Sequence, residues 1–280
     1  MNMTAKINIG IVGFGRIGRN LLRLGYNDPR FNFVGISDLA EPEALFYLLG
    51  HDTVYGPTET EAILEDNYIH FGHQKVRILP GTGPGSLAWD ALGADIIIDC
   101  TGRVWPRTDL EKYLETGAKR VIVTKPPEDP VDRIVVMGLN DIDISIDDKI
   151  VSPSSSTTQV LALMLDILDN EFGLEKAMMT SVHAYTSDQP LADSVRSDLR
   201  RSRSAVENII PNQTRSPQLV ETIMPHFKGK IAGIAFNVPI PDGSCVDLTT
   251  QLQSTPSVED VNALMKDVSE NSMSAIIGYT

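Results

Sequence analysis

The sequence contains little cysteine: Cys100 and Cys245 are the only two in a chain of 280 residues. They lack the repeated spacing of a disulfide framework or a zinc site, so each is interpreted as a small buried hydrophobe. The five histidines suggest no metal site either, because His70 and His73 have no carboxylate or cysteine set near them. We therefore expect a reduced protein without a resident metal ion.

Long apolar runs and an excess of positive charge are also missing. No stretch of about 18 apolar residues occurs, and no signal-peptide pattern precedes the first strand pattern. The 37 Asp and Glu residues outnumber the 24 Lys and Arg residues, which gives a formal net charge of −13. Such a chain repels nucleic acid and anionic membranes on average. We expect a cytoplasmic protein with neither a nucleic-acid nor a membrane partner.

The first half of the chain carries a dinucleotide-binding pattern. An apolar run at residues 7–12 leads into GFGRIG at residues 13–18, and a helical pattern follows. A second apolar run ends at Asp38, about 20 residues further on. Strand, glycines, helix and acidic residue in this order predict a Rossmann site for a nicotinamide dinucleotide.

Each part of this pattern has a physical role. Gly13 permits the tight turn, Gly15 lets the backbone approach a pyrophosphate, and Gly18 lets helix and strand pack closely. The first N–H groups of the helix are available to the phosphates. Asp38 can accept hydrogen bonds from the adenosine ribose, which favours NAD because a carboxylate repels a 2′-phosphate.

Further strand patterns at residues 94–102 and 120–126 flank a short helical pattern, and such alternation implies a parallel, doubly wound sheet. Residues 57–90 are less helical and predict a hairpin excursion. Thr101 and Thr124 follow the two strands at their carboxyl ends, where ligands bind in such sheets.

The second half is rich in polar groups near predicted helix and strand ends. Residues 150–159, IVSPSSSTTQ, precede a helical pattern, which indicates either a helix cap or a site for an anion or oxyanion. His183 lies in a strand pattern at residues 176–186. Residues 229–241 and 244–255 predict long antiparallel strands, and residues 257–270 predict a helix capped by serine.

An arginine-rich loop follows the His183 strand. Its cations are Arg196, Arg200, Arg201 and Arg203. Two interpretations stay open: a solvated or subunit-contacting loop, and a clamp for a phosphorylated ligand.

The whole chain resembles the glyceraldehyde-3-phosphate dehydrogenase family. The motifs that carry the resemblance are, in chain order, GFGRIGR, DCTG, VHAYTSDQ, DLRRSRSA, NIIP, VPIP and IIGYT. The resemblance implies an α/β protein: a Rossmann-type doubly wound parallel sheet in residues 1–154, then an α+β catalytic domain with a mostly antiparallel sheet in residues 155–280. It further implies a homo-oligomer, a tetramer or a dimer.

The resemblance also assigns roles to individual residues. His183 falls at the catalytic base. The cofactor positions, beside the glycine motif, are Arg16, Ile17, Asp38, Thr101 and Thr124. The substrate or phosphate positions are Ser155, Thr157, Thr186, Arg201 and Thr214.

Several positions depart from the family pattern. Ser156 stands where the family has its nucleophilic cysteine, and Asn237 stands where it has a phosphate-binding arginine. Arg215 replaces the glycine after Thr214 and is a further candidate phosphate contact. The chain also stops at Thr280, before the closing helix of the family, so we expect the catalytic domain to be truncated.

These departures leave two hypotheses. The first is an NAD-dependent oxidoreductase (NADP also possible, because the loop has Ser194) that uses His183, with Ser156 at the nucleophile position, on an anionic aldehyde, ketone or alcohol. We expect its ordinary phosphorylating activity to be lost or very weak. The alternative is a catalytically inactive, NAD-binding protein with a regulatory or structural role. A single engineered substitution at Ser156 is disfavoured, because Asn237 and Arg215 differ as well.

Overall fold

The computed structural model describes residues 6–81 and 83–280. Contacts group the described residues into two compact units. Unit 1 comprises Met1–Val135 and Ile144–Ser154, and unit 2 comprises Val136–Asp143 and Ser155–Thr280. The sequence suggested a single boundary after residue 154 and gave no sign that Val136–Asp143 joins unit 2. This segment does so because Val136 packs into the core of unit 2 and the Met137 N–H donates to Gln159 Oε1 over 3.2 Å.

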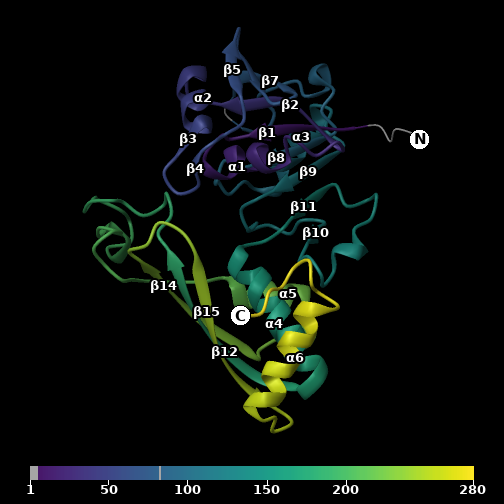
Figure 1. Ribbon diagram of the computed structural model, residues 1–280, viewed down its shortest axis with the longest axis vertical. Coiled ribbons are helices and arrows are strands. Elements are labelled where there is room, and N and C mark those ends of the chain that lie inside the picture. Colours follow the sequence, from purple (N-terminus) through teal and green to yellow (C-terminus); the bar gives the residue numbers. More distant parts are fainter. Residues whose placement is uncertain (1–5, 82) are drawn as a thin grey trace. The chain divides into compact units, whose positions relative to one another are not determined.

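Unit 1 is built on one nine-stranded sheet with the order β10-β11-β9-β8-β1-β2-β7-β6-β5 (Figure 1). Its pairs are parallel from β10 to β7, and the β7-β6 and β6-β5 pairs are antiparallel. The predicted doubly wound sheet and the hairpin excursion are confirmed. The larger elements of this unit are β1 (Ile7–Val12), α1 (Arg16–Gly25), β2 (Phe31–Asp38), α2 (Pro42–Gly50), β5 (Ala62–Glu65), β6 (Tyr68–Phe71), β7 (Gln74–Pro80), β8 (Ile96–Asp99), α3 (Arg107–Glu115), β9 (Arg120–Val123), β10 (Arg133–Ile134) and β11 (Ile150–Ser152). A two-stranded pair, β3 (His51–Asp52) with β4 (Gly56–Pro57), completes it.

Four successive residues of β1, from Ile9 to Val12, are buried because both faces of this sheet are covered. Ile9 and Ile11 of β1 are buried in one core, which also contains Leu22 of α1 and Leu45 of α2. Val12 is buried in a second core together with Leu110 of α3. A strand that contacts a core on each side is buried at successive positions, which is why Gly10 and Val12 are buried as well as Ile9 and Ile11.

Unit 2 contains a four-stranded sheet with the order β13-β14-β12-β15. The pairs of β12 with β15 and of β13 with β14 are antiparallel, whereas β12 and β14 run parallel. The two antiparallel strands predicted at residues 229–241 and 244–255 are present as β14 and β15. Both flank β12: β15 runs antiparallel to β12, whereas β14 runs parallel to β12 and antiparallel to β13. The elements are α4 (Ser156–Phe172), β12 (Leu174–Ala184), β13 (Ile210–Asn212), α5 (Ser216–Ile223), β14 (Ile231–Val238), β15 (Ser244–Leu252) and α6 (Val258–Glu270).

One face of this sheet is covered by α4 and α5 (Figure 1). The core between them contains Leu161 and Leu165 of α4, Val220 of α5 and Met179 of β12. The predicted serine cap of the last helix is confirmed: Ser257 and Asp260 form a reciprocal capping box at the start of α6. In the described part of the chain no helix combines the length and the apolar character that crossing a membrane requires.

Candidate functional site

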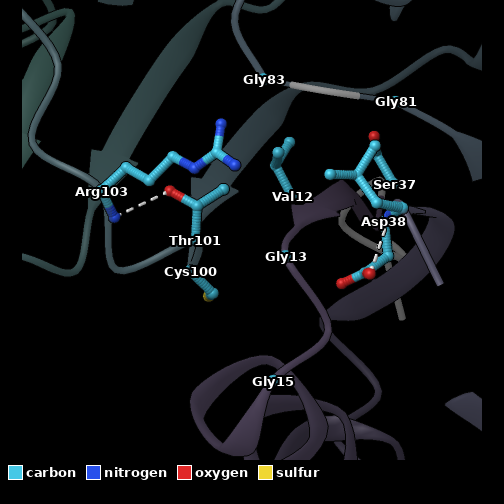
Figure 2. Close-up of a pocket in the computed structure, with 11 residues that line it drawn as sticks. Val12, Gly13, Gly15, Ser37, Asp38, Gly81, Gly83, Cys100, Thr101 and Arg103 are labelled. Carbon is cyan, nitrogen blue, oxygen red and sulfur yellow. Dashed lines mark hydrogen bonds between the residues drawn. The ribbon is translucent and has the colours of Figure 1, made fainter. Parts of the chain in front are cut away.

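A pocket of about 230 Å³ lies at the carboxyl edge of the parallel sheet in unit 1 (Figure 2). It collects residues from the ends of four adjacent strands, β8, β1, β2 and β7. Open parallel sheets bind ligands at this edge because the loops there leave a crevice. The lining residues are Val12, Gly13, Gly15, Ser37, Asp38, Leu39, Gly81, Gly83, Cys100, Thr101 and Arg103.

The glycines of the first loop leave the space that a dinucleotide needs. Gly13 has φ +83°, and a Cβ there would lie 2.8 Å from the backbone of Thr101. A Cβ on Gly18 would overlap the carbonyl oxygen of Gly13, so α1 packs directly on the loop. A Cβ on Gly15, in contrast, would meet nothing within 4 Å. Gly15 therefore faces open space at the start of α1, where phosphates bind.

Asp38 is fixed by three backbone donors. Its Oδ2 accepts the Phe14 N–H over 2.7 Å, and its Oδ1 accepts the N–H groups of Leu39 and Ala40 over 2.7 and 3.0 Å. The bond from Phe14 ties the end of β2 to the glycine loop. A carboxylate offers about four acceptor positions, two on each oxygen, so Oδ2 can still accept a ribose hydroxyl. The loop, the start of α1 and Asp38 together fit a dinucleotide.

At the end of β8, the pocket residue Thr101 is held by hydrogen bonds to a buried carboxylate. Asp99 Oδ1 accepts both the N–H and the hydroxyl of Thr101, over 3.0 and 2.7 Å, and Oδ2 accepts the Tyr113 hydroxyl over 2.9 Å. Burial, followed by the Asp99 charge, raises the pKa of Tyr113 well above its usual range. The same two causes raise the pKa of the Cys100 thiol to about 12, so this thiol is not a nucleophile at neutral pH.

The predicted cofactor residues occupy different places in unit 1. Gly13, Gly15, Asp38 and Thr101 line the pocket. Arg16 and Ile17 are exposed in the first turn of α1, and Gly18 is buried behind the loop. Thr124 does not line the pocket, because its hydroxyl donates to the Asp99 carbonyl over 2.8 Å. Sequence reasoning did not predict the remaining lining residues as cofactor positions, because none of them has a place in the spaced glycine-and-acid motif: Val12, Ser37, Leu39, Gly81, Gly83, Cys100 and Arg103.

Unit 2 brings the starts of two helices together through a chain of hydroxyl groups. Ser155 caps α4: its Oγ accepts the Thr158 N–H over 3.1 Å and lies 2.9 Å from Thr158 Oγ1. Thr158 Oγ1 donates to Ser216 Oγ at the first residue of α5 over 3.1 Å. The Thr214 hydroxyl donates to the same Ser216 oxygen over 3.2 Å. The predicted substrate residues Ser155 and Thr214 therefore belong to one cluster, in which Thr158 and Ser216 are the buried links.

Ser156 is the first residue of α4 and is exposed. Its hydroxyl makes no hydrogen bond to any residue that the structure describes, whereas the next side chain, Thr157, is buried. Arg215 is the N-cap residue of α5 and is exposed. Both predicted residues therefore lie at helix N-termini, where partial positive charge favours anions.

His183 lies near the end of β12 and is half-buried. Its Nδ1 lies 2.8 Å from the Ala184 carbonyl oxygen. Because a carbonyl only accepts, Nδ1 carries the proton, and Nε2 of the neutral ring is left as an acceptor. Strand alternation places His183 on the same face as the buried Ala177, Met179 and Ser181, which is the face covered by α4 and α5.

Asn237 holds the backbone beside His183. The two residues are paired in the parallel register of β12 and β14. Asn237 is buried, its Nδ2 donates to the Ala184 carbonyl over 3.2 Å, and its Oδ1 accepts from Asn212 over 3.0 Å. This side chain is therefore engaged in the scaffold at the position where the family resemblance expects an arginine for phosphate.

Thr186 and Arg201 lie in the loop that follows β12. The Thr186 N–H and hydroxyl both donate to Gln189 Oε1, over 2.7 and 3.0 Å. Arg201 lies in a short 3₁₀ turn, Arg200–Ser202, with its guanidinium 4.0 Å from the Asp188 carboxylate. Among the described residues there is no group of three or more His, Cys, Asp or Glu side chains that could hold a metal ion.

Comparisons with known proteins match both units. The family model "Glyceraldehyde 3-phosphate dehydrogenase, NAD binding domain" matches residues 7–107, and the model for the C-terminal domain of the same enzyme matches residues 155–280. The chain is 41% identical over 280 residues to glyceraldehyde-3-phosphate dehydrogenase 1 of Trichormus variabilis, covering 99% of this chain and 81% of that protein. It is 37% identical over 276 residues to glyceraldehyde-3-phosphate dehydrogenase 1 of Bacillus subtilis, covering 98% and 82%. Against glyceraldehyde-3-phosphate dehydrogenase of Geobacillus stearothermophilus the identity is 38%, with coverage of 98% and 82%.

Proposed function

Because this chain belongs to the glyceraldehyde-3-phosphate dehydrogenase family, we propose that it oxidises or reduces an anionic oxo compound without a covalent cysteine intermediate. NAD is its cofactor, and the glycine loop and Asp38 fit that dinucleotide. The observation that carries the proposal is the 2.8 Å contact between His183 Nδ1 and the Ala184 carbonyl oxygen, because in the neutral ring this contact leaves Nε2 as the acceptor for a proton.

Ser156 and His183 are proposed to face the same reacting atoms. The chain reverses at Gly173, between α4 and β12, where φ is +70°. From there α4 spans about 24 Å back to Ser156, and β12 spans about 30 Å to His183. The side chain of His183 is on the sheet face that α4 covers. Both residues therefore lie toward the end of unit 2 that is remote from Gly173.

The side chain at position 156 decides which chemistry is open to this site. The family reaction needs a nucleophile that adds to an aldehyde and then leaves as a reactive thioester. A thiol with a pKa of about 8.5, lowered by a histidine and a helix N-terminus, is partly ionised at neutral pH. A serine hydroxyl is not, and general-base assistance contributes only about 10²- to 10⁴-fold. We therefore expect the phosphorylating reaction to be absent or very weak.

Direct hydride transfer between substrate and cofactor needs no nucleophilic side chain. Bound NAD supplies the hydride acceptor or, when reduced, the donor. When a hydrated aldehyde is oxidised, Nε2 of His183 takes the proton of one hydroxyl as the carbon loses hydride, and a carboxylic acid forms. In the second form of the reaction, reduction, His183 starts protonated and gives its proton to the oxygen of an aldehyde or ketone as the carbon gains hydride, and an alcohol forms. The exposed hydroxyl of Ser156 orients the substrate oxygen.

The hydroxyl cluster supports an anionic substrate. Ser155 and Thr214 are linked through two buried hydroxyls and lie at the starts of α4 and α5. Two neighbouring helix N-termini favour negative charge, and the exposed Arg215 adds a cation there. We therefore propose a carboxylate or phosphate on the substrate, with Thr157, Thr186 and Arg201 as further contacts.

The end of β2 favours NAD over NADP. Both oxygens of Asp38 are held by backbone N–H groups in the pocket, so the carboxylate cannot easily turn away from a 2′-phosphate. Ser194 in the arginine-rich loop keeps some NADP acceptance open.

The test is an activity screen of the purified protein with a panel of aldehydes, ketones and alcohols, phosphorylated and not, with NAD and NADP in both directions. We expect phosphate-independent turnover that falls about 10²- to 10⁴-fold in His183→Gln. Robust phosphate-dependent oxidation of glyceraldehyde-3-phosphate would contradict the chemical argument. Cofactor binding without turnover of any compound in the panel would favour the catalytically inactive alternative.

A further inference from the structure

Arg103 lines the pocket in unit 1 and has no assigned role. It follows Thr101 at the end of β8, and its N–H donates to Thr101 Oγ1 over 3.2 Å. It is the one cationic side chain among the described lining residues. No carboxylate in the described part of the chain lies within ion-pair distance of its guanidinium. This exposed cation is therefore available to a ligand.

The Arg103 guanidinium lies beside an indole ring. Its Cζ lies 5.7 Å from the ring centroid of Trp105, a cation–π contact. Trp105 is itself held by the loop after β7, because a Cβ on Gly83 would lie only 2.8 Å from its Cζ2. Arg103 is thus supported from one side by a ring that cannot easily move.

The Arg103 guanidinium lies toward the end of the pocket where a base would lie. In this sheet type the pyrophosphate binds at the start of the first helix and the ribose at the acid after the second strand. Here these positions are Gly15 and Asp38, so the base lies beyond Asp38, away from Gly15. Figure 2 shows the Arg103 guanidinium reaching toward Gly83 on that side of the pocket.

Gly81 and Gly83, in the loop after β7, also line the pocket. A Cβ on Gly81 would collide with the Ser37 hydroxyl, which is buried and has no hydrogen-bond partner among the described residues. Glycine is therefore required at position 81, and neither Gly81 nor Gly83 adds a side chain to the pocket lining.

Resting on the NAD assignment of the proposed function, we propose that Arg103 is a cofactor-binding residue that stacks on the adenine ring, in the order Trp105, Arg103, adenine. A guanidinium is planar and stacks on aromatic faces, whereas a lysine ammonium does not. Arg103 thereby adds affinity for the adenosine half of the cofactor and takes no part in hydride transfer.

The experiment measures binding of NAD and AMP by calorimetry, and of adenosine by ligand-observed nuclear magnetic resonance, to the wild type, Arg103→Ala and Arg103→Lys. We expect Arg103→Ala to weaken all three ligands by a similar factor, about three- to thirtyfold. Arg103→Lys should recover little of this loss, and the loss should persist in high salt. The matched control is Arg77→Ala, an exposed cation on β7 outside the pocket lining, which should bind like the wild type.

Two outcomes overturn the stacking role. Unchanged affinity in Arg103→Ala removes Arg103 from the cofactor site. A loss that affects NAD and AMP but not adenosine, or that Lys restores, means a phosphate contact instead. The experiment measures binding and not turnover, so it can support the stacking role even if the proposed reaction is wrong. If the wild type binds none of the three ligands, both the stacking role and the NAD assignment are wrong.

Discussion

The cofactor pocket of unit 1 and the hydroxyl cluster of unit 2 are built from different parts of the chain. Backbone and four glycines, Gly13, Gly15, Gly81 and Gly83, make much of the pocket surface. Side-chain oxygens of Ser155, Thr158, Ser216 and Thr214 make the cluster. A pocket surface made of glycine backbone tolerates few substitutions, because an added Cβ either occupies the ligand's space or strains the backbone. A surface of side chains can change its chemistry at one position while the helices remain, as Ser156 illustrates.

The largest expected effect tests the backbone-built surface with two matched glycine changes in unit 1. Gly18→Ala should reduce the free energy of unfolding by about 1–3 kcal/mol, because the new Cβ overlaps the Gly13 carbonyl oxygen. Gly15→Ala should leave the melting temperature unchanged, because its Cβ meets nothing within 4 Å. It should still weaken NAD binding about tenfold to hundredfold, since that open space belongs to the pyrophosphate.

Calorimetry and thermal denaturation on both variants separate these effects. If Gly15→Ala binds NAD as tightly as the wild type, the pocket at the start of α1 is not where the cofactor phosphates bind.

The second prediction concerns the side-chain-built surface. In a Cys245→Ser background, Ser156→Cys should be alkylated about tenfold faster at pH 7 than Val160→Cys, because the helix N-terminus and His183 lower the thiol pKa below about 8.5. Val160 is a matched control: it is exposed on the same helix, one turn further from the N-terminus. Cys100 stays silent, since burial and Asp99 raise its pKa to about 12.

The alkylation rate is followed against pH for both variants. Equal midpoints at position 156 and position 160 would mean that His183 is out of reach, and the proposed active site would then be wrong. A low midpoint without restored phosphate-dependent turnover is the result we expect, because Asn237 is held in the scaffold by Ala184 and Asn212.

The difference between a backbone-built pocket and a side-chain-built cluster also explains which features could be predicted from the sequence. The glycine loop, Asp38 and the parallel sheet were predictable, because the backbone geometry they need dictates residue type and spacing. Arg103 and Gly81 line the same pocket but are brought there by tertiary packing, so no spacing reveals them.

In unit 2 the sequence located the helix start at Ser155 but not its link to Ser216, since the partner comes from a different helix. The parallel pairing of β14 with β12 was also missed. An apolar strand pattern shows that a strand exists, but it does not fix which neighbour the strand pairs with.

Thr158→Val tests whether the hydroxyl cluster holds unit 2 together as well as presenting polar groups. Thr158 is fully buried, and its hydroxyl lies between Ser155 Oγ and Ser216 Oγ. Removing it should lower the free energy of unfolding by about 1–2 kcal/mol. Thr222→Val is the control, because its exposed hydroxyl donates only to the Gln218 carbonyl. Equal stability of the two variants in urea would show that the cluster is not structural.

The smallest expected effect is a pH dependence confined to unit 1. Partial burial raises the pKa of Asp132, but N–H groups of Ile150 and Lys149 and the Arg107 guanidinium outweigh it and hold that pKa below its usual value. A carboxyl whose pKa is lower in the folded state stabilises the protein above its unfolded pKa, about 3.9. This stabilisation is lost as the pH falls through the folded pKa. In Asp132→Asn the free energy of unfolding should therefore fall less steeply between pH 7 and pH 3 than in the wild type, as measured by urea unfolding. Glu128 is exposed in the preceding loop, so Glu128→Gln should show the pH dependence of the wild type. If stability falls with pH in both variants as it does in the wild type, the hydrogen bonds that join β11 and α3 through Asp132 do not stabilise the fold measurably. Of these two polar networks, only the hydroxyl cluster of unit 2 would then contribute to stability.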